Sequence, residues 1–444
     1  MKTIFLVIPR RISVRYVLSS DVLDYFKKDP NIFLVILTSI NDPSFVKEFS
    51  NQNVVVETIP MRDGKEFFLE RWCRNLRNYL GSICYDLATL NAKAKMNGKL
   101  VWLAYRFLVA VIRPFLFLRS WLKWVDIKIF SPLLDKNYET LFGRYKPDLI
   151  CIHSVQELTA VPVARVARRR KVPSLGIVLS WDNLANKGDI YSYSDKLVVW
   201  NEIMKNHAVW YHGYKKEDVF VTGTPQFDFY FRDKEEVPAR DDFFRDLSLD
   251  KNKELIVYAT VPERIGGQTE INSIEAIYRA MKEGRLEKPA QLLVRIYTKD
   301  DPLRYERFKN LPDLVLYDPG KVGQNLGYRG ADKFFFLQLA AMIKYASIVV
   351  NIASTTSIDA AILDTPIINI AIGKQRYWYE TSHYRDLIAT DGVLLARSFE
   401  ELISSINHYF KNPASHKEGR AKIVELLCGG LGRASQKLAQ CIIS

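Results

Sequence analysis

Short runs of β-branched and other apolar residues recur along the chain, and a helix-like or polar segment follows each run. In the first half they cover residues 3–8, 32–38, 53–59, 148–152, 174–179, 196–200 and 218–222. In the second half they cover residues 255–259, 292–296, 314–317, 347–351 and 366–370. This alternation is typical of parallel sheets whose strands are joined by helices. The sequence therefore predicts an α/β protein with two Rossmann-like sheets.

The length of the chain indicates two domains. At 444 residues it exceeds the size at which one hydrophobic core usually stops growing. A breaker cluster at 223–225 follows the last run of the first series, and a polar, charged segment covers 232–253. We therefore predict an N-terminal domain over 1–228 and a C-terminal domain over 229–444 that ends in helices. Such domains should face one another across a cleft, since ligands bind at the carboxyl ends of the strands in open α/β sheets.

Residues 65–143 interrupt the first series with a helical insertion. Between Leu87 and Val125 there is no acidic residue, whereas lysines and arginines alternate with tryptophan, tyrosine and phenylalanine. Arg106, Arg113 and Pro114 stand inside its most apolar part, which disfavours a membrane-spanning helix. Two interpretations stay open with equal weight. Residues 93–128 lie in the plane of an anionic membrane surface, or they form a buried helix hairpin whose basic ends reach solvent.

The net charge and the cysteines limit the partners and the compartment. Lysine and arginine number 63 against 50 acids, giving +13, which suits an anionic partner such as a nucleotide phosphate or an acidic membrane. Nucleic acid is disfavoured because no recognised binding module is present. The five cysteines are scattered without zinc or disulfide spacing, and the N-terminus lacks a secretion signal. We expect a cytoplasmic protein, peripheral at the inner face of the cell membrane.

The strongest local motif covers 349–370. It reads as a buried strand, a hydroxyl-rich turn and a helix that opens near Ser354, with Asp359 in its first turn. Backbone N–H groups and the hydroxyls of Ser354, Thr355 and Thr356 could bind phosphate. The Asp359 carboxylate could accept hydrogen bonds from ribose hydroxyls. An ordinary capped helix gives the same pattern, so the motif alone leaves both interpretations open.

Three further segments extend this motif to a family resemblance. They are SerTrpAspAsnLeuAlaAsnLysGly at 180–188, ValTrpAsn at 199–201 followed by Met204 and His207, and ValThrGlyThrProGlnPheAsp at 221–228. Together with 349–370 they resemble GT-B glycosyltransferases, CDP-glycerol glycerophosphotransferases and UDP-N-acetylglucosamine 2-epimerases. The pattern is similar to that of bacterial surface-polysaccharide transferases related to the CDP-glycerol enzymes. The resemblance covers most of the chain from about residue 145 onward, with the motifs in the same order.

Two departures limit the resemblance. Where CDP-glycerol enzymes tend to have Arg-x-His-Pro, this chain has Arg295, Ile296, Tyr297 and Thr298. The insertion at 65–143 has no counterpart in the family pattern. Polyol-phosphate transfer is therefore ranked below sugar transfer.

The resemblance implies a nucleotide-activated sugar donor bound by the second domain. The donor-binding candidates are Ser354, Thr355, Thr356, Asp359, Arg295, Gly320 and Thr260. No Asp-x-Asp and no metal-spaced His or Cys pair occurs, so we expect no metal and no cofactor apart from the donor as co-substrate. Helix amides and Arg295 would then offset the charge that develops on the leaving nucleotide. The absence of a glycine-rich fingerprint argues against NAD or FAD.

The acceptor and the catalytic base are expected in the first domain. Asp182 follows a strand and could deprotonate an acceptor hydroxyl if burial raises its pKa, although a turn-forming role is nearly as favoured. His153 and Glu157 are rivals, because they also follow a strand. The candidates for binding the acceptor are Arg10, Arg15, Trp181 and Asn183.

These observations predict a metal-independent glycosyltransferase. It would transfer a sugar, for example a Kdo-like or other unusual sugar, to a glycan or lipid-linked acceptor in cell-surface polysaccharide synthesis. The enzymatic alternatives are a CDP-polyol phosphotransferase and a nucleotide-sugar 2-epimerase. The alternative without catalysis is a basic protein that binds membranes or nucleic acid.

Overall fold

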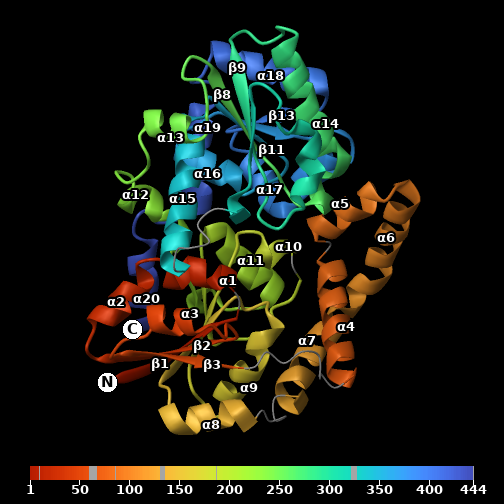
Figure 1. Ribbon diagram of the computed structural model, residues 1–444. Coiled ribbons are helices and arrows are strands. Elements are labelled where there is room, and N and C mark those ends of the chain that lie inside the picture. Colours follow the sequence, from red (N-terminus) through yellow and green to blue (C-terminus); the bar gives the residue numbers. More distant parts are fainter. Residues whose placement is uncertain are drawn as a thin grey trace. The chain divides into compact units, whose positions relative to one another are not determined.

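A computed structural model of the chain describes residues 1–9, 11–59, 68–85, 87–130, 136–186, 188–321 and 328–443. The chain forms two compact units (Figure 1). The first comprises Met1–Phe229, Gly327–Arg329 and Cys428–Ser444, and the second comprises Tyr230–Leu326 and Gly330–Leu427. Each unit contains one parallel sheet, which confirms the predicted α/β class. The C-terminal segment groups with the first unit, whereas the sequence placed it in the second domain.

The first unit is built on a seven-stranded sheet in the order β3-β2-β1-β4-β5-β6-β7. All pairings between these strands are parallel. The strands are β1 (Lys2–Ile8), β2 (Ile32–Thr38), β3 (Val54–Thr58), β4 (Leu149–His153), β5 (Ser174–Ile177), β6 (Lys196–Val199) and β7 (Val219–Val221). The parallel arrangement brings all seven carboxyl ends to one edge of the sheet.

Helices cover both faces of this sheet because its strands are apolar on both sides. Ile4 and Leu6 pack in one core with η1 (Val14–Leu18), α2 (Val22–Lys28), α3 (Pro43–Phe49) and α20 (Ala434–Ile443). Phe5 points to the opposite face, where its ring centroid lies 5.1 Å from that of Phe142 in α8 (Lys136–Tyr145). Helix α9 (Val161–Arg169) packs beside α8 and contacts β4 and β5. Figure 1 shows α2 and α20 at one side of the sheet and α8 and α9 at the other.

The 221–228 motif holds the C-terminal helix in the first unit. Gly223 has φ +81°, and a Cβ there would lie 1.7 Å from the carbonyl oxygen of Gly429. Asp228 accepts hydrogen bonds from the backbone N–H groups of Ala434 (3.2 Å) and Ser435 (2.7 Å) at the start of α20. A carboxylate at a helix N-terminus satisfies backbone donors that otherwise have no partner. The motif therefore has a structural role in this fold.

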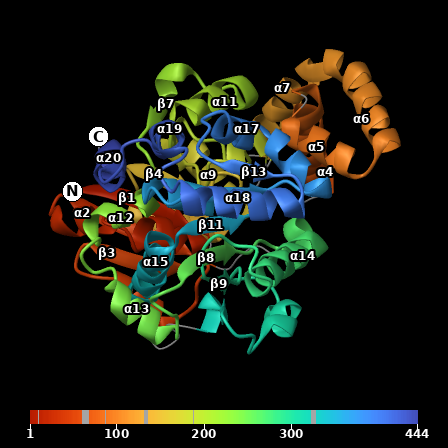
Figure 2. The same cartoon turned by 90° about the horizontal axis from the view of Figure 1, so that it is seen from above.

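The second unit contains a six-stranded parallel sheet in the order β10-β9-β8-β11-β12-β13. Its strands are β8 (Glu254–Ala259), β9 (Ala290–Arg295), β10 (Leu314–Tyr317), β11 (Ile348–Asn351), β12 (Ile367–Ile370) and β13 (Leu394–Ala396). Helices α14 (Glu263–Lys282) and α18 (Phe399–Lys411) pack side by side on one face (Figure 2). The other helices of the unit are α12 (Phe229–Arg232), α13 (Arg240–Asp246), α15 (Tyr328–Tyr345), α16 (Thr356–Ile362), α17 (Ser382–Ile388) and α19 (Lys417–Cys428).

The described part of the insertion is helical, as predicted. Its elements are α4 (Phe68–Cys84), α5 (Ala88–Met96), α6 (Lys99–Ile112), η2 (Arg113–Phe115), α7 (Leu116–Val125) and η3 (Asp126–Phe130). Helix α4 contacts α6, η2 and α7. Pro114 lies in η2, where it interrupts the regular helical hydrogen bonding between α6 and α7.

The stretch Lys99–Ile129 of the insertion leaves most of its apolar side chains unburied. Among the described residues, Lys99–Ile129 is the stretch that is long and apolar enough to cross a membrane, and 6% of its most apolar window is buried. Only Val109, Leu122 and Val125 of its described side chains are buried apolar residues. The interpretation as a buried hairpin is therefore wrong. The membrane interpretation stays a prediction.

A buried ion cluster fastens the insertion to the first sheet. Asp189, 3% exposed, follows β5 and its short helix α10 (Asn183–Asn186). Its carboxylate pairs with Arg77 of α4 at 2.8 Å and with Arg119 of α7 at 2.9 Å. Burial opposes the charged form of Asp189, but His212, whose Nδ1 lies 3.6 Å from the Asp189 Oδ1, and the two arginine charges outweigh it and lower its pKa. The cluster therefore needs the ionised carboxylate.

We predict that Asp189→Asn destabilises the first unit by about 3–5 kcal/mol, because it leaves buried guanidinium groups without their counter-charge. The depressed pKa means that this stabilisation is present above the unfolded-state pKa near ~4 and is lost as the pH falls below it. Urea denaturation at pH 7 measures the loss. The control is Asp246→Asn, whose side chain is 64% exposed beside Arg245 and should change stability by less than about 1 kcal/mol.

Candidate functional site

The predicted donor-binding residues follow adjacent strands of the second sheet. Thr260 follows β8, Arg295 ends β9, Gly320 lies after β10, and the bend at Ser354 follows β11. These strands are neighbours in the order β10-β9-β8-β11. Because they are parallel, the structure brings these candidates to the same edge of the sheet.

A network of side chains holds the bend after β11. Asn351 Oδ1 accepts a hydrogen bond from the Ser354 N–H (3.2 Å) and from Asn369 Nδ2 (3.0 Å). Ala353 has φ +44°, and its N–H donates to the Tyr379 hydroxyl (3.0 Å). The Tyr384 hydroxyl donates to the Ser354 carbonyl (2.6 Å). Hydrogen bonds with buried side chains therefore hold the backbone of the bend in place.

The hydroxyls of the bend remain at the surface of the unit. Ser354 is half-buried and Thr355 is exposed, whereas Thr356 is 8% exposed. Ser354 Oγ lies 3.0 Å from Thr356 Oγ1 and accepts from the Thr356 N–H at 3.2 Å. The helix that follows, α16, presents its first turn beside these hydroxyls. The N–H groups of Ser354 and Thr356 already donate inside the bend, so the bend can offer the hydroxyls of Ser354 and Thr355 to an anion.

Asp359 lies one turn into α16 and is the most perturbed of the predicted site residues in the second unit. The Tyr230 hydroxyl donates to its carboxylate at 2.8 Å. Burial raises the pKa of Asp359 to about 6, and the Tyr230 hydrogen bond and the charge of Arg295 moderate that rise. The Arg295 guanidinium carbon stands 5.0 Å from the ring centroid of Phe335. A half-buried carboxylate and a buried arginine therefore act on one another at this edge.

Thr260 and Gly320 have local structural roles. Thr260 Oγ1 accepts from the Tyr297 N–H (2.8 Å), and the Thr260 N–H donates to the Arg295 carbonyl (3.0 Å). Gly320 N–H donates to Asp318 Oδ1 at 2.9 Å in an exposed turn. Thr260 thus links the ends of β8 and β9, and Gly320 shapes the loop after β10.

The sequence missed two residues of this region. Tyr230 carries no recognisable motif, although it follows the 221–228 segment directly. Glu270 of α14 is fully buried, accepting from the Val261 N–H and the Tyr305 hydroxyl, each at 2.8 Å. Burial raises the pKa of Glu270 to about 7. A lone glutamate in a helical pattern gives no sequence signal of such burial.

The three candidate bases follow two adjacent strands of the first sheet. His153 ends β4 and is in register with Ile177 at the end of β5. Gln156 Nε2 donates to the Asn183 carbonyl at 2.9 Å, which joins the loop after β4 to the loop after β5. Glu157 and Asp182 are half-buried in these two loops. The structure therefore brings the three candidates to one edge of the first sheet.

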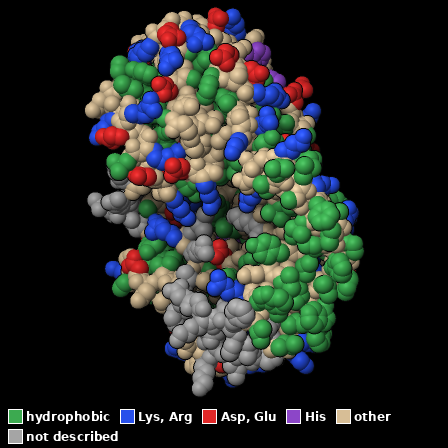
Figure 3. Space-filling view, turned by 90° about the vertical axis from the view of Figure 1, so that its right-hand side faces the viewer, with side chains coloured by type: hydrophobic (Ala, Val, Ile, Leu, Met, Phe, Trp, Pro, Cys, Tyr) green, Lys and Arg blue, Asp and Glu red, His purple; other side chains and the backbone are tan. Residues whose placement is uncertain are grey.

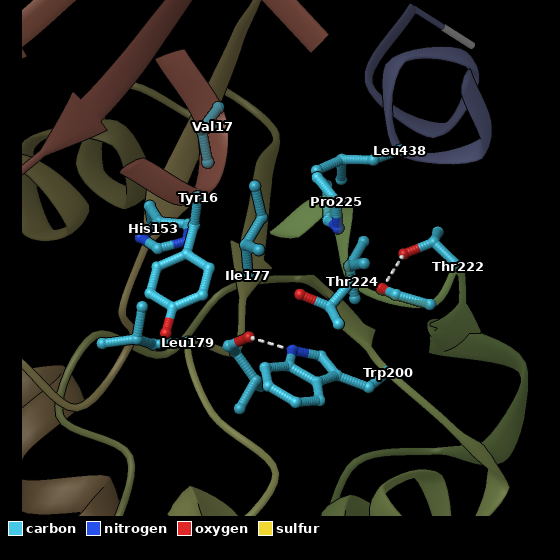
Figure 4. Close-up of a pocket in the computed structure, with 13 residues that line it drawn as sticks. Tyr16, Val17, His153, Ile177, Leu179, Trp200, Thr222, Thr224, Pro225 and Leu438 are labelled. Carbon is cyan, nitrogen blue, oxygen red and sulfur yellow. Dashed lines mark hydrogen bonds between the residues drawn. The ribbon is translucent and has the colours of Figure 1, made fainter. Parts of the chain in front are cut away.

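His153 differs from the other two in its burial. It is 2% exposed, and burial lowers its pKa to about 3. Its ring stacks on Tyr16 at 6.3 Å between centroids and an angle of 23°. Both residues line a small pocket with Trp200 and residues 222–225, shown in Figure 4. A histidine with this pKa is neutral at pH 7 and a weak base.

The predicted acceptor-binding residues are mostly enclosed. Trp181 is 4% exposed and Asn183 is 3% exposed, so their side chains lie in the interior of the first unit. Arg15 lies half-buried in η1. Arg10 lies outside the described residues. Of the SerTrpAspAsn segment, only Ser180 and Asp182 have partly accessible side chains.

The other motifs of the first unit also have structural roles. Asn201 caps α11 (Glu202–His212) by accepting from the Met204 N–H at 2.9 Å. Trp200 Nε1 donates to the Val178 carbonyl at 3.2 Å. Burial lowers the pKa of His207 to about 4. Within the described ranges, no group of three or more His, Cys, Asp or Glu side chains is placed to hold a metal ion.

Comparison with known proteins identifies the fold. No protein-family model matches the chain, and no curated protein matches its sequence. A UDP-GlcNAc 2-epimerase from Neisseria meningitidis, bound to UDP-GlcNAc, superposes with a TM-score of 0.58 at 13% identity, covering 100% of both chains. A UDP-GlcNAc 2-epimerase from Methanocaldococcus jannaschii, in complex with UDP-GlcNAc and UDP, has a TM-score of 0.55 at 13% identity and covers 100% of this chain and 99% of its own.

A glycosyltransferase from Rickettsia africae has a TM-score of 0.53 at 13% identity, covering 100% of this chain and 99% of its own. The fold is GT-B. The predicted fold, with one parallel α/β sheet in each of two units, is therefore confirmed. The similarity to CDP-glycerol enzymes stays a prediction.

We predict that Asp359→Asn weakens nucleotide-sugar binding by about tenfold to a hundredfold, because it removes a charged acceptor for ribose hydroxyls worth about 1.5–3 kcal/mol. Wild-type affinity should also fall as the pH drops through about 6, where Asp359 becomes protonated. Calorimetric titration from pH 5 to pH 8 measures both effects, using the tightest binder among UDP-, GDP-, CDP- and CMP-linked sugars.

Stability should respond differently from affinity. A carboxylate with a raised folded-state pKa is destabilising in its charged form, so folding stability falls as the pH rises toward and through about 6. Asp359→Asn should therefore melt no lower than wild type at pH 7.5. The control Asp241→Asn, 72% exposed, should change neither quantity. Unaltered affinity in Asp359→Asn would contradict the assignment.

Proposed function

We propose that this protein is a glycosyltransferase that transfers a sugar from a nucleotide-activated donor to a glycan or lipid-linked acceptor. The activity would belong to cell-surface polysaccharide synthesis on the cytoplasmic side of the membrane. The observation that carries the proposal is the half-buried carboxylate of Asp359, which accepts a hydrogen bond from Tyr230 and feels the charge of Arg295 beside the hydroxyl-bearing bend. The fold is shared with proteins that bind UDP-GlcNAc.

In this proposal the second unit binds the donor. Asp359 accepts from ribose hydroxyls, and the bend at Ser354 donates to phosphate oxygens. Arg295 is 9% exposed, so its charge acts in a poorly solvated environment where electrostatic interactions are strong. As the bond between the anomeric carbon and the donor phosphate breaks, Arg295 offsets the charge left on the nucleotide.

The first unit supplies the base. A base removes the proton of the acceptor hydroxyl while its oxygen forms the new bond to the anomeric carbon. A general base works best with a pKa near the working pH, and burial puts the pKa of His153 at about 3. Asp182 and Glu157 are more accessible than His153. We assign Asp182 as the base, and Glu157 is the alternative candidate.

Asp182→Asn should lower turnover by about 10²–10⁴-fold without changing donor affinity, since a general base acts on the reaction step. The measurement is nucleotide release with the nucleotide sugar that binds most tightly, in the presence of lipid-extracted glycan acceptors. Glu157→Gln is the matched variant. If Glu157→Gln loses activity and Asp182→Asn keeps it, the assignment of the base reverses.

The same assay separates the alternative activities. Two of the structures compared above are 2-epimerases, which favours epimerisation as the second candidate. An epimerase converts the nucleotide sugar alone and needs no acceptor. A CDP-polyol phosphotransferase releases CMP from CDP-glycerol. A C2-epimerised nucleotide sugar formed without acceptor, and no transfer product, would reject the glycosyltransferase proposal.

Transfer should continue in the presence of EDTA, because in this proposal Arg295 and the end of α16, rather than a divalent ion, stabilise the leaving diphosphate. Added magnesium should then have little effect. The measurement is turnover after dialysis against chelator. Complete loss of turnover with EDTA and recovery with magnesium would show that a metal ion takes this role.

A further inference from the structure

The insertion presents a broad apolar surface. Leu100, Phe107, Phe117, Trp121, Trp124 and Ile129 are each more than half exposed. Leu69 and Trp72 of α4, the helix that contacts α6 and α7, are also more than half exposed. Figure 3 shows hydrophobic side chains gathered in a broad green area on one side of the face turned to the viewer. Soluble monomers rarely expose large contiguous apolar areas, so this face has a docking role.

The charge around this apolar face is positive. Lys93, Lys99, Arg106, Arg113 and Lys128 are exposed in the same segment. No acidic residue occurs between Leu87 and Val125. In Figure 3, blue side chains lie at the margins of the green area. An apolar face with a basic border and exposed tryptophans complements the acyl chains and the anionic headgroups of a lipid bilayer.

We propose that the apolar face of Lys99–Ile129 inserts into one leaflet of an anionic phospholipid bilayer and lies in its plane. The ion pair between Arg119 and Asp189 (2.9 Å) and the buried side chains of Leu122 and Val125 fix α7 to the body of the first unit. A helix that crossed the bilayer would have to break these contacts and carry Arg106 and Arg113 into the hydrocarbon. An in-plane position keeps the contacts and leaves the arginines at headgroup level.

The positive border also argues against a second copy of the chain as the occupant. In a twofold symmetric dimer the same patch meets itself, so its lysines and arginines would face like charges. Anionic lipid supplies the opposite charge over the whole border. The proposal concerns docking and holds whichever nucleotide-sugar reaction the protein catalyses.

Flotation of the full-length protein with vesicles tests the apolar part of the proposal. Binding is expected to phosphatidylcholine vesicles that contain phosphatidylglycerol, and much weaker binding to pure phosphatidylcholine. The double variant Phe107→Ser/Trp121→Ser should bind at least about tenfold more weakly, since binding scales with buried apolar area. The matched control is Trp210→Ser/Phe231→Ser, whose side chains are 63% and 44% exposed elsewhere. Thermal melting confirms that each variant is folded.

A charge-reversal pair tests the electrostatic part. Arg106→Glu/Arg113→Glu should lower affinity for the anionic vesicles by about tenfold or more, because each basic residue near the surface contributes about 1 kcal/mol, or about fivefold. The control Lys374→Glu/Lys422→Glu makes the same change at exposed positions of the second unit and should bind like wild type.

Four outcomes would overturn the proposal. One is absence of binding to the anionic vesicles by the wild-type chain. Another is equal loss of binding in the test and control variants. The third is a dimer, measured by light scattering, that Phe107→Ser/Trp121→Ser dissociates while vesicles bind neither form. Bound protein should also exchange to added unlabelled anionic vesicles, and a failure to exchange would indicate a spanning helix instead.

Discussion

The ionised carboxylate of Asp189 is the interaction on which the arrangement of the first unit depends. It brings together α4 through Arg77, α7 through Arg119 and the loop that follows α10. Lys123 lies at the same place, with its ammonium 3.9 Å from the ring centroid of Tyr193, and burial lowers its pKa to about 8. Removing so many charges from water is costly unless each has a partner. The cluster therefore fixes the position of the insertion relative to the loop that carries Asp182.

Burial raises the pKa of Glu270 to about 7 and that of Asp359 to about 6, and the surroundings of these two carboxylates in the second unit separate their roles. Glu270 is fully enclosed and accepts from Val261 and Tyr305, so its environment is complete without a ligand. Asp359 is half-buried beside an exposed turn, and its partners Tyr230 and Arg295 moderate rather than cancel the effect of burial. Perturbed groups that remain reachable are typical of functional sites. Asp359 is thus the stronger candidate for contact with a ligand.

Much of the fold could be predicted from hydrophobic periodicity, because strands buried on both faces give nearly continuous apolar runs. Strand β13 was not predicted, although β7, which also has three residues, was. The C-terminal helices were predicted without their boundary: α19 ends at Cys428, and Gly429 and Gly430 adopt positive φ before α20 begins. The exposure of the insertion could not be predicted, since a buried helix and a lipid-facing helix have the same composition. The partnership of Tyr230 with Asp359 joins positions 129 residues apart and leaves no local pattern.

Several residues of the motifs that resemble the family stabilise the fold of this chain. Asn201 caps α11, Asp228 caps α20, and Gly223 permits the close approach of Gly429. In this chain these motifs therefore stabilise the fold, and they say little about the reaction. The features that they do not explain are the half-buried carboxylate of Asp182 and the apolar, basic insertion. In the proposed function a lipid-linked acceptor gives the insertion a role, because the protein would meet that acceptor at the membrane surface. The alternative of epimerising a soluble nucleotide sugar gives the insertion no such role.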